Sequence, residues 1–370
     1  MNKLSIYIHW PFCKSKCPYC DFNSHELKKI DHHSYTNAFL QEIEFNRKLI
    51  ENKRIDSIFF GGGTPSLMKT ETVYKILNRI NSISLINKDA EITLEVNPNA
   101  IDRKKFIDFR AVGINRVSIG VQSFKDNNLK FLGRTHSSKD VFEAINLAKK
   151  LFKNYSFDLM YCLPNQSPNE WEKELLEAVQ YISHHISCYQ LTIEKGTQFY
   201  NKYRSKCFIL PEDDTSTSMY NLTCDLLNSH GINQYEISNF AKSGYECRHN
   251  LCYWNMQDYI GIGPGAHGRY KLDGNIWSTI NFYNPDKWIE YLRSDKKPVQ
   301  LHRKLSSKDS YLDTLSMGLR LNRGIEASFI QNFSSLQKLT SLGFLRVGKG
   351  FVSCTSKGRV VLNYLIRELL

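Results

Sequence analysis

The sequence predicts an α/β protein: an open (βα)6 partial TIM-type barrel followed by a small C-terminal α+β domain of winged-helix type. Two observations predict the barrel. Short apolar runs typical of buried strands alternate with amphipathic helical stretches, and polar side chains gather just after the strands. A third observation predicts the C-terminal domain, because amphipathic helices there precede a hairpin pattern and a last helix.

Six stretches have the composition of strands, being rich in β-branched and aromatic residues. They are residues 4–9, 54–60, 91–96, 116–121, 155–160 and 186–193. Stretches with apolar residues at helical spacing fall between them, at 31–51, 71–83, 103–111, 138–150 and 168–182. Strand–helix–strand units form parallel sheets with right-handed crossovers. Six such units are too few to close a TIM barrel, so an open one is expected.

The length predicts more than one domain. The chain has 370 residues, whereas one core usually stops growing at about 250–300 residues. We expect a barrel domain at 1–235, a connecting region at 236–300 and a C-terminal domain at 301–370. In the last of these, helices are expected at 308–319, 334–342 and 359–370, with a hairpin around the Gly348–Gly350 turn.

The composition favours a reducing compartment and a solvated surface. The formal net charge is +12, but Lys and Arg are spread along the chain without forming a basic block, so no nucleic-acid partner is expected. No apolar run reaches the roughly 18–20 residues of a spanning helix, and no secretory pattern opens the sequence. Ten cysteines in such a chain favour metal binding over disulfides. The cytoplasm is the expected location.

Three cysteines, Cys13, Cys17 and Cys20, follow the first strand at C-x3-C-x2-C spacing. Thiolates on so short a loop can converge on an iron–sulfur cluster. Three protein ligands leave one iron of a [4Fe–4S] cluster open to another molecule. A structural zinc site needs a fourth ligand, and the next cysteine is Cys162. Free buried cysteines are common, but they have no reason to gather among Pro, Lys and Ser.

A triple glycine, Gly61–Gly63, comes directly after the second strand. Glycine permits positive φ and close approach of the backbone to a ligand, although a tight turn needs the same residues. The segment lacks the spacing of the nucleotide-binding loops.

A second unusual segment runs from Cys247 to Trp254 and contains His249 next to Tyr253. Its histidine is either a residue of a packed turn with its hydrogen bonds made within the protein, or a ligand of a metal or haem. Zinc held by Cys247, His249 and Cys252 would lack a fourth ligand. A neutral imidazole beside flat aromatic rings also suits haem, with the imidazole as axial ligand.

Together these motifs resemble the radical S-adenosylmethionine (SAM) superfamily, whose signature is C-x3-C-x2-C with an aromatic residue before the last cysteine. The segments 7–13 and 61–65 resemble its oxygen-independent coproporphyrinogen III oxidase family more narrowly. His249-Asn250-x-x-Tyr253-Trp254 and the glycine-rich segment 261–268 resemble the HemW-type branch of haem chaperones. The resemblance implies that SAM binds the open iron and that the reduced cluster can cleave it to a 5′-deoxyadenosyl radical.

The resemblance also implies which residues form the site. Cys13, Cys17 and Cys20 would hold the cluster, and His249 would bind haem. The positions that contact SAM in the family are Tyr7, Tyr19, Gly62, Gly63, Thr64, Glu95, Gln122, Arg134 and Asp158. Carboxylates there can accept from ribose hydroxyls, and Arg134 can pair with the SAM carboxylate. Cys162 departs from the pattern, since the family usually has glycine at that place.

The expected function is therefore that of a cytoplasmic haem chaperone of radical SAM type, which passes haem to an acceptor protein of unknown identity. Membrane-associated haem enzymes are one class of candidate acceptors. The alternative is an oxygen-independent coproporphyrinogen III oxidase, which converts propionates to vinyls by radical decarboxylation. Phe22 argues against the oxidase, because true oxidases carry a fourth cysteine there. SAM cleavage is expected in either case, and radical chemistry on another substrate is a third possibility.

Overall fold

The computed structural model describes residues 3–27, 29–100 and 102–370. Within them one twelve-stranded sheet has the order β14-β13-β12-β11-β1-β4-β5-β6-β7-β8-β10-β9. In chain order its strands are β1 (Lys3–Trp10), β4 (Arg54–Gly62), β5 (Ile86–Val96), β6 (Arg116–Gln122), β7 (Asn154–Tyr161), β8 (His185–Gln190), β9 (Asn233–Gln234), β10 (Asn239–Ala241), β11 (Tyr259–Ile262), β12 (His267–Leu272), β13 (Asn275–Asn281) and β14 (Val299–Lys304).

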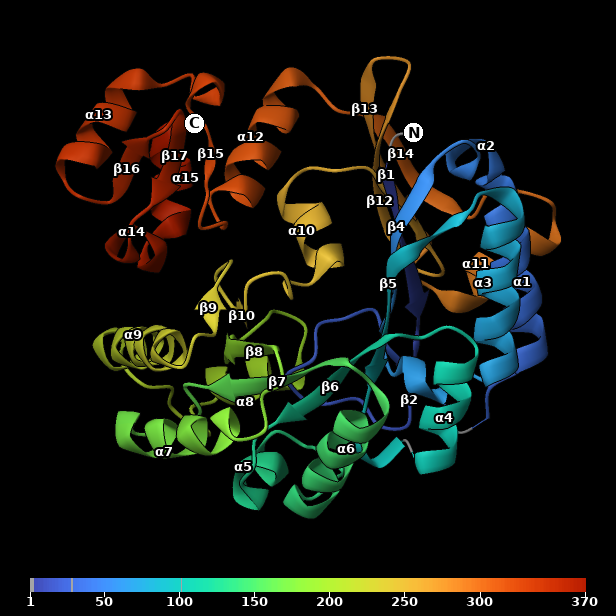
Figure 1. The fold of residues 1–370 in the computed structure, drawn as a ribbon, viewed down its shortest axis with the longest axis horizontal. Helices are drawn as coiled ribbons and strands as arrows, with labels where there is room; N and C mark the ends of the chain where they lie inside the picture. Colours follow the sequence, from blue (N-terminus) through green and yellow to red (C-terminus); the bar gives the residue numbers. More distant parts are fainter. Residues whose placement is uncertain (1–2, 28, 101) are drawn as a thin grey trace.

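Most helices pack on the outer face of this sheet, whereas the C-terminal helices lie in a separate group beside it (Figure 1). The helices are α1 (His32–Phe45), α2 (Arg47–Ile50), α3 (Thr70–Ile83), α4 (Arg103–Ala111), α5 (Asp126–Phe131), α6 (Ser138–Leu151), α7 (Pro168–Val179), α8 (Gln198–Arg204), α9 (Asp213–Ser229), α10 (Arg248–Trp254), α11 (Pro285–Arg293), α12 (Ser307–Gly318), α13 (Phe333–Ser341), α14 (Ser356–Val360) and α15 (Leu362–Leu369). None of the helices in the described residues is both long and apolar enough to cross a membrane.

The six predicted strands are β1, β4, β5, β6, β7 and β8, and neighbouring members of this series pair in parallel. The α/β fold with an open parallel sheet is therefore confirmed. The last strand ends at Gln190, before its predicted end at 193. Leu191 is apolar for a different reason, because it is buried in a small cluster that includes Phe199 of α8.

The predicted helices between the strands are present as α1, α3, α4, α6 and α7. The helix expected at 31–51 is divided at Asn46, which caps the end of α1 with φ −97° and ψ 6°. Its side chain donates from Nδ2 to the carbonyl of Glu42 at 3.0 Å. Asparagine readily bonds to nearby backbone in this way, which offers the chain an alternative to continuing the helix.

Residues 236–300, expected to connect two domains, instead extend the main sheet on both sides. β11 lies parallel to β1, with Ser5 opposite Tyr259, and β12 and β13 follow antiparallel. At the other edge, β10 pairs with β8. β14 pairs with β13, so the sheet continues past residue 301. β10 and β11 are only three and four residues long, and β14 is mostly polar and exposed, so these strands lack the apolar pattern of the predicted ones.

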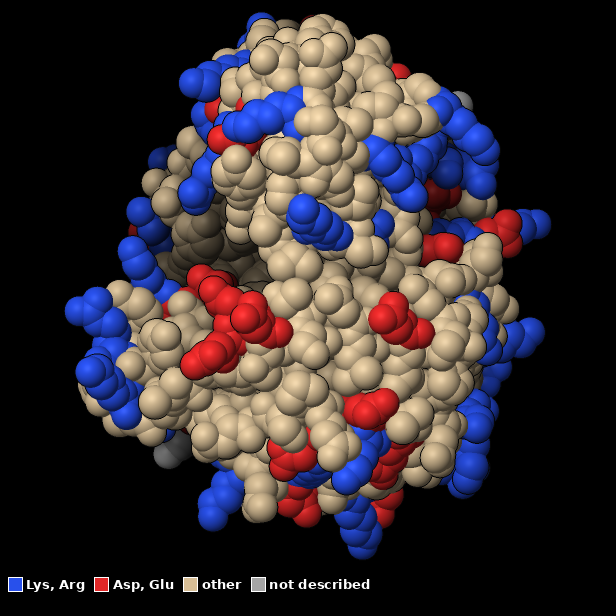
Figure 2. Space-filling view, turned by 90° about the vertical axis from the view of Figure 1, so that its left-hand side faces the viewer, with Lys and Arg blue, Asp and Glu red and all other residues tan. Residues whose placement is uncertain are grey.

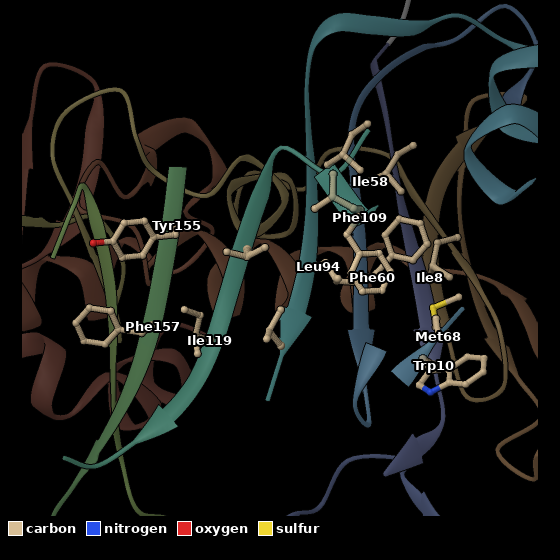
Figure 3. Packing of buried hydrophobic residues seen from close by; sticks show 14 of the residues in the cluster. Ile8, Trp10, Ile58, Phe60, Met68, Leu94, Phe109, Ile119, Tyr155 and Phe157 are labelled. Carbon is tan, nitrogen blue, oxygen red and sulfur yellow. The ribbon is translucent and has the colours of Figure 1, made fainter. Parts of the chain in front are cut away.

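The main core lies between the sheet and the outer helices. Ile8, Ile58, Phe60 and Leu94 of adjacent strands are almost fully buried there (Figure 3). Burial of each such side chain contributes about 1.5–3 kcal/mol. This packing fixes the strand ends, and with them the loops that carry the predicted site residues.

The C-terminal elements have a hydrophobic cluster of their own, which includes Leu315 of α12 and Leu365 of α15. The predicted hairpin is present as β16 (Leu345–Gly348) and β17 (Phe351–Cys354). A strand that the sequence did not reveal, β15 (Ile325–Glu326), pairs with β17. On the face drawn in Figure 2, Lys and Arg are spread out and interspersed with acidic residues.

Candidate functional site

The three cysteines lie on the loop that leads from β1 to α1, and each thiol has its own polar neighbour. Thr64 Oγ1 donates to Cys13 Sγ at 3.4 Å, and Arg134 Nη1 donates to Cys17 Sγ at 3.3 Å. The Sγ of Cys20 lies 3.7 Å from the hydroxyl of Ser24. Donors placed on the sulfurs stabilise thiolates, which are the form that binds metal.

The arrangement of the three thiols on the loop is compatible with a multinuclear cluster. Within the described residues, no three His, Cys, Asp or Glu side chains are close enough together to hold one metal ion. A [4Fe–4S] cluster does not need such a common point, because its irons occupy separate corners and three of the four can each bind one thiolate. All three thiols are free. Burial raises the pKa of the Cys13 and Cys20 thiols, so metal binding would displace their protons.

The triple glycine is explained by close contact between β4 and the cysteine loop. The amide of Gly63 donates to the carbonyl of Trp10 at 2.7 Å, and a Cβ on Gly63 would lie 2.7 Å from the carbonyl oxygen of Phe12. Gly62 has φ +111° and donates from its amide to Glu95 Oε2 at 3.1 Å. The glycines therefore bring the end of β4 against the cysteines and against Glu95.

A polar cavity of about 310 Å³ lies inside the curved sheet. Four of the predicted residues line it, namely Tyr7, Glu95, Asp158 and His249. Burial, and next the neighbouring Asp158, raises the pKa of Glu95 to about 8. Burial raises the pKa of Asp158 to about 6, against the opposing effects of Ser187 and Arg116. Glu95 and Asp158 thus lie close enough for the charge of one to affect the pKa of the other, and their carboxyl oxygens can accept hydrogen bonds from a polar ligand.

A second cavity of about 440 Å³ adjoins the first, and Tyr7, Glu95 and Tyr253 line both. Gly62 lines the second cavity as well. Its wall contains aromatic and thioether side chains, together with histidine, arginine, two carboxyl groups (Glu95 and Asp313) and two amides (Asn23 and Gln257). Among its lining residues are Phe22, Tyr253, Trp254, Met256, His267, Arg269, Tyr283 and Met317. The two cavities together form a space that is polar at one end and apolar at the other.

The other predicted residues lie around the cysteine loop, outside the linings of these two cavities. They are Tyr19, Gly63, Thr64, Gln122 and Arg134. Tyr19 packs against Phe199, with ring centroids 6.2 Å apart. Gln122 ends β6 with φ 73°, an uncommon conformation for a residue other than glycine. The ends of the parallel strands thus bring together most of the residues that the sequence singled out.

His249 is fully enclosed, with 1% of its surface exposed. Its Nδ1 is hydrogen-bonded to Ser57 Oγ at 2.9 Å, and its Nε2 to the Tyr253 hydroxyl at 2.8 Å. The ring stacks on Phe59 at 5.2 Å between centroids. Burial, and next the charge of Arg116, lowers the pKa of His249 to about 3. The imidazole is therefore neutral, and both of its nitrogens are already engaged within the chain.

The two cysteines near His249 face different partners. Cys247 Sγ donates to Glu91 Oε1 at 3.4 Å, and Cys252 Sγ donates to the carbonyl of Asp258 at 3.6 Å. The zinc alternative considered for Cys247, His249 and Cys252 has no convergent geometry among the described residues.

Sequence reasoning missed several residues of these cavities. Arg116 is fully buried, lies 3.9 Å from Glu91 and donates to Ser156 Oγ at 2.9 Å. A charged residue at the start of a predicted buried strand was the available signal. His9 is buried between the Tyr7 hydroxyl, at 3.1 Å, and the carbonyl of Asn23, at 2.8 Å.

Comparisons with known proteins identify the family of this chain. Residues 7–178 match the Radical SAM superfamily. The chain is 37% identical to "Heme chaperone HemW" of Buchnera aphidicola subsp. Schizaphis graminum, covering 99% of this chain and 98% of that protein. It is 36% identical to "Radical S-adenosyl methionine domain-containing protein 1, mitochondrial" of Danio rerio, covering 99% of this chain and 86% of that one.

The fold matches a solved structure over the whole chain. "Coproporphyrinogen III oxidase (HemN)" from Escherichia coli aligns with a TM-score of 0.83 at 20% identity, covering 100% of this chain and 90% of that one. An identity this low shows a common fold. The sequence relatives extend over nearly the full length at more than a third identical residues. This chain therefore belongs to the HemW-type family of radical SAM proteins.

Proposed function

We propose that this chain is a haem chaperone of radical SAM type, which binds one [4Fe–4S] cluster, SAM and haem and passes haem to an acceptor protein. The observation that supports it most is the apolar, aromatic-lined cavity whose wall includes Phe22 of the cysteine loop. Relatives at 37–41% identity carry the name "Heme chaperone HemW". A flat apolar ligand beside the cysteine loop is consistent with both the aromatic lining of the cavity and the names of these relatives.

In this proposal Cys13, Cys17 and Cys20 hold the cluster, which when bound supplies a single electron and an open iron for SAM. Three free thiols on one loop, each near a polar donor, support the assignment. The remaining residues orient SAM. Glu95 and Asp158 accept from hydroxyl groups, and Arg134 faces the carboxylate.

In the same proposal, SAM also contacts the remaining residues that the resemblance assigns to it. These are Tyr7, Tyr19, Gly62, Gly63, Thr64 and Gln122. His249, the residue that the resemblance assigns to haem, lines the polar cavity and bonds to the hydroxyl of Tyr253 at 2.8 Å, and the Tyr253 ring lines the apolar cavity as well. The proposed acceptors are haem proteins, with membrane-associated haem enzymes as one class, and the proposed location is the cytoplasm.

The alternative function, decarboxylation of coproporphyrinogen III, is weaker. The likeness to the oxidase structure is one of fold. Phe22 stands where the resemblance places the fourth cysteine of the oxidases, and its side chain is 60% exposed. A large apolar side chain at that place cannot supply a thiol.

Haem titration in parallel with a decarboxylation assay separates the two functions. Protein reconstituted without oxygen is expected to develop a Soret band on addition of haem and to form no vinyl product from coproporphyrinogen III. Conversion of that substrate above a control without protein would favour the oxidase. Absence of any Soret band would overturn the chaperone proposal.

The cluster ligands are tested separately. Cys17→Ala is expected to abolish the iron–sulfur absorbance, whereas Cys207→Ala, at an exposed cysteine, is expected to retain it. Metal analysis should find iron and sulfide in the wild-type protein. Zinc in their place, or undiminished iron in Cys17→Ala, would contradict the ligand assignment.

A further inference from the structure

The apolar cavity has the dimensions and lining of a cofactor pocket. Its volume of about 440 Å³ falls within the range of roughly 300–1,000 Å³ that is usual for such pockets. Tyr253 and Trp254 form one part of the wall, and Met256 and Met317 provide thioethers. Aromatic faces and polarisable sulfurs suit a flat macrocycle such as a porphyrin.

Two side chains at this cavity are unusually exposed for their type. Phe22 is 60% exposed and Tyr283 is 43% exposed, and both line the cavity. Met256, at the end of α10, has φ 55°, which is uncommon for a residue of its bulk. An apolar ligand in the cavity would cover the two exposed rings.

Two histidines, His185 and His249, line the polar cavity, and two others, His9 and His267, line the apolar cavity. Of the two in the apolar cavity, only His267 has a ring nitrogen free for iron among the described residues. Both nitrogens of His9 and both of His249 are hydrogen-bonded within the chain. His267 makes one such bond, from Nε2 to the Tyr283 hydroxyl at 3.2 Å. Its side chain is exposed, and its Nδ1 has no hydrogen-bond partner in the described part of the chain.

The backbone around His267 is held firmly by the cysteine loop. Asn23 donates from Nδ2 to the carbonyls of Pro264 and Tyr283, at 2.9 Å each. Gly265 has φ +75°, and a Cβ there would lie 2.4 Å from Asn23 Nδ2. The absence of a side chain at Gly265 therefore permits close packing that fixes the start of β12 beside the cysteine loop. Partial desolvation at the cavity wall, and next the charge of Arg269, lowers the pKa of His267.

We propose that haem occupies this apolar cavity and that His267 is its axial ligand. The assignment rests on the proposed function and makes it more specific. The macrocycle would lie against Tyr253 and Trp254, with Met256 and Met317 around its edge. His249 then acts as a positioning residue, because its bond to the Tyr253 hydroxyl fixes the orientation of that ring.

Haem titration of reconstituted full-length variants tests the ligand. His267→Gln keeps the size and polarity of the side chain but removes the imidazole. It is expected to lose the histidine-ligated spectrum and to bind haem roughly tenfold or more weakly. His267→Gly is expected to regain that spectrum when imidazole is added. His33→Gln, at an exposed histidine of α1, is the matched control and should behave as wild type.

The same titration on His249→Gln distinguishes the two candidate ligands. It is expected to keep the histidine-ligated spectrum. Loss of that spectrum in His249→Gln with its retention in His267→Gln would overturn the assignment. A wild-type protein that binds no haem would instead overturn the proposed function itself.

The position of the macrocycle has an independent test in Met317→Trp, which fills part of the cavity from α12. Haem affinity is expected to fall several-fold, while the iron and sulfide content stays at the wild-type level. Unchanged haem affinity in this variant, with the cluster intact, would place haem outside the cavity and overturn the proposal.

Discussion

The guanidinium of Arg134 donates from Nη1 to the Sγ of Cys17 at 3.3 Å, which joins the segment before α6 to the cysteine loop. Its Nη2 donates to Asn97 Oδ1 at 2.9 Å and to the carbonyl of Gly120 at 3.0 Å. Its Nε is buried and has no partner among the described residues. One cation is thus held beside a proposed cluster ligand, with a donor left for an anionic group.

Arg134→Lys should weaken SAM binding and leave the cluster in place. Lysine keeps the charge but cannot serve three acceptors from fixed positions. A hydrogen bond to a charged group contributes about 1.5–3 kcal/mol, so the Kd for SAM should rise roughly tenfold or more. Equilibrium binding to reconstituted protein measures it, with Arg110→Lys, at an exposed arginine of α4, as control. An unchanged Kd would remove Arg134 from the proposed SAM site.

Glu42 should make the stability of the fold depend on pH. Its carboxyl accepts from the Gly263 amide, Asn281 Nδ2 and Trp288 Nε1 at 2.8, 2.6 and 2.9 Å. Burial raises its pKa to about 8 despite these donors. Because the folded pKa exceeds the unfolded one, the contribution of Glu42 to stability is complete below about pH 4.5 and is lost as pH rises through 8.

Relative to Glu42→Gln, the wild-type free energy of unfolding should therefore fall between pH 4.5 and 8. The expected decrease is on the order of 3–5 kcal/mol. Denaturant unfolding at several pH values measures this difference, and Glu143→Gln, at an exposed position of α6, should show no such trend. A constant difference between wild type and Glu42→Gln would contradict a raised pKa.

Gly263→Ala should destabilise the fold more than Gly244→Ala. Both glycines have positive φ, +109° and +85°, but a Cβ on Gly263 would lie 2.4 Å from the carbonyl oxygen of His9, whereas Gly244 has nothing within 4 Å. The control should lose about 1–2 kcal/mol from backbone strain alone. Gly263→Ala should lose roughly 3 kcal/mol or more in thermal or denaturant unfolding. Equal losses would mean that the β11–β12 connection can move away from β1.

Arg320→Ala should lower the free energy of unfolding, because Arg320 links the C-terminal elements to the end of the main sheet. Arg320 donates from Nη2 to Oε2 of the fully buried Glu236 at 2.9 Å, and its guanidinium lies 4.5 Å from the centroid of the Trp254 ring. Without Arg320, the buried Glu236 carboxyl keeps the Ser238 amide and Asn239 Nδ2 as donors to Oε1, so the expected cost is that of one hydrogen bond to a charged group, about 1.5–3 kcal/mol.

Arg323→Ala is the matched control for this variant, because Arg323 is exposed and lies over the Phe351 ring at 4.2 Å. It should lose only about 0.5–1 kcal/mol. Denaturant unfolding of both variants measures the two losses. A loss in Arg320→Ala no larger than in Arg323→Ala would show that the Glu236 pair adds little.

Local sequence patterns were sufficient for the parallel half of the sheet. Strands β1, β4, β5, β6, β7 and β8 were predicted because each is a short run rich in β-branched and aromatic residues that alternates with an amphipathic helical stretch. The strands from β11 to β14 were not, since β11 is only four residues long and lies in a glycine-rich segment. Its partner β1 is more than 250 residues away in the chain, and no local pattern encodes that pairing.

By itself the sequence determined the α/β class, the family, the three cysteines and the strand ends where polar residues gather, because spacing and periodicity are properties of neighbouring residues. Only the tertiary structure decided that both nitrogens of His249 are bonded within the chain, while His267 faces a cavity with one nitrogen free. The difference arises from contacts between distant segments, such as Ser57 with His249 and Asn23 with Pro264. Those contacts are set by how the strands and loops pack, and the packing has no signature in any short stretch of sequence.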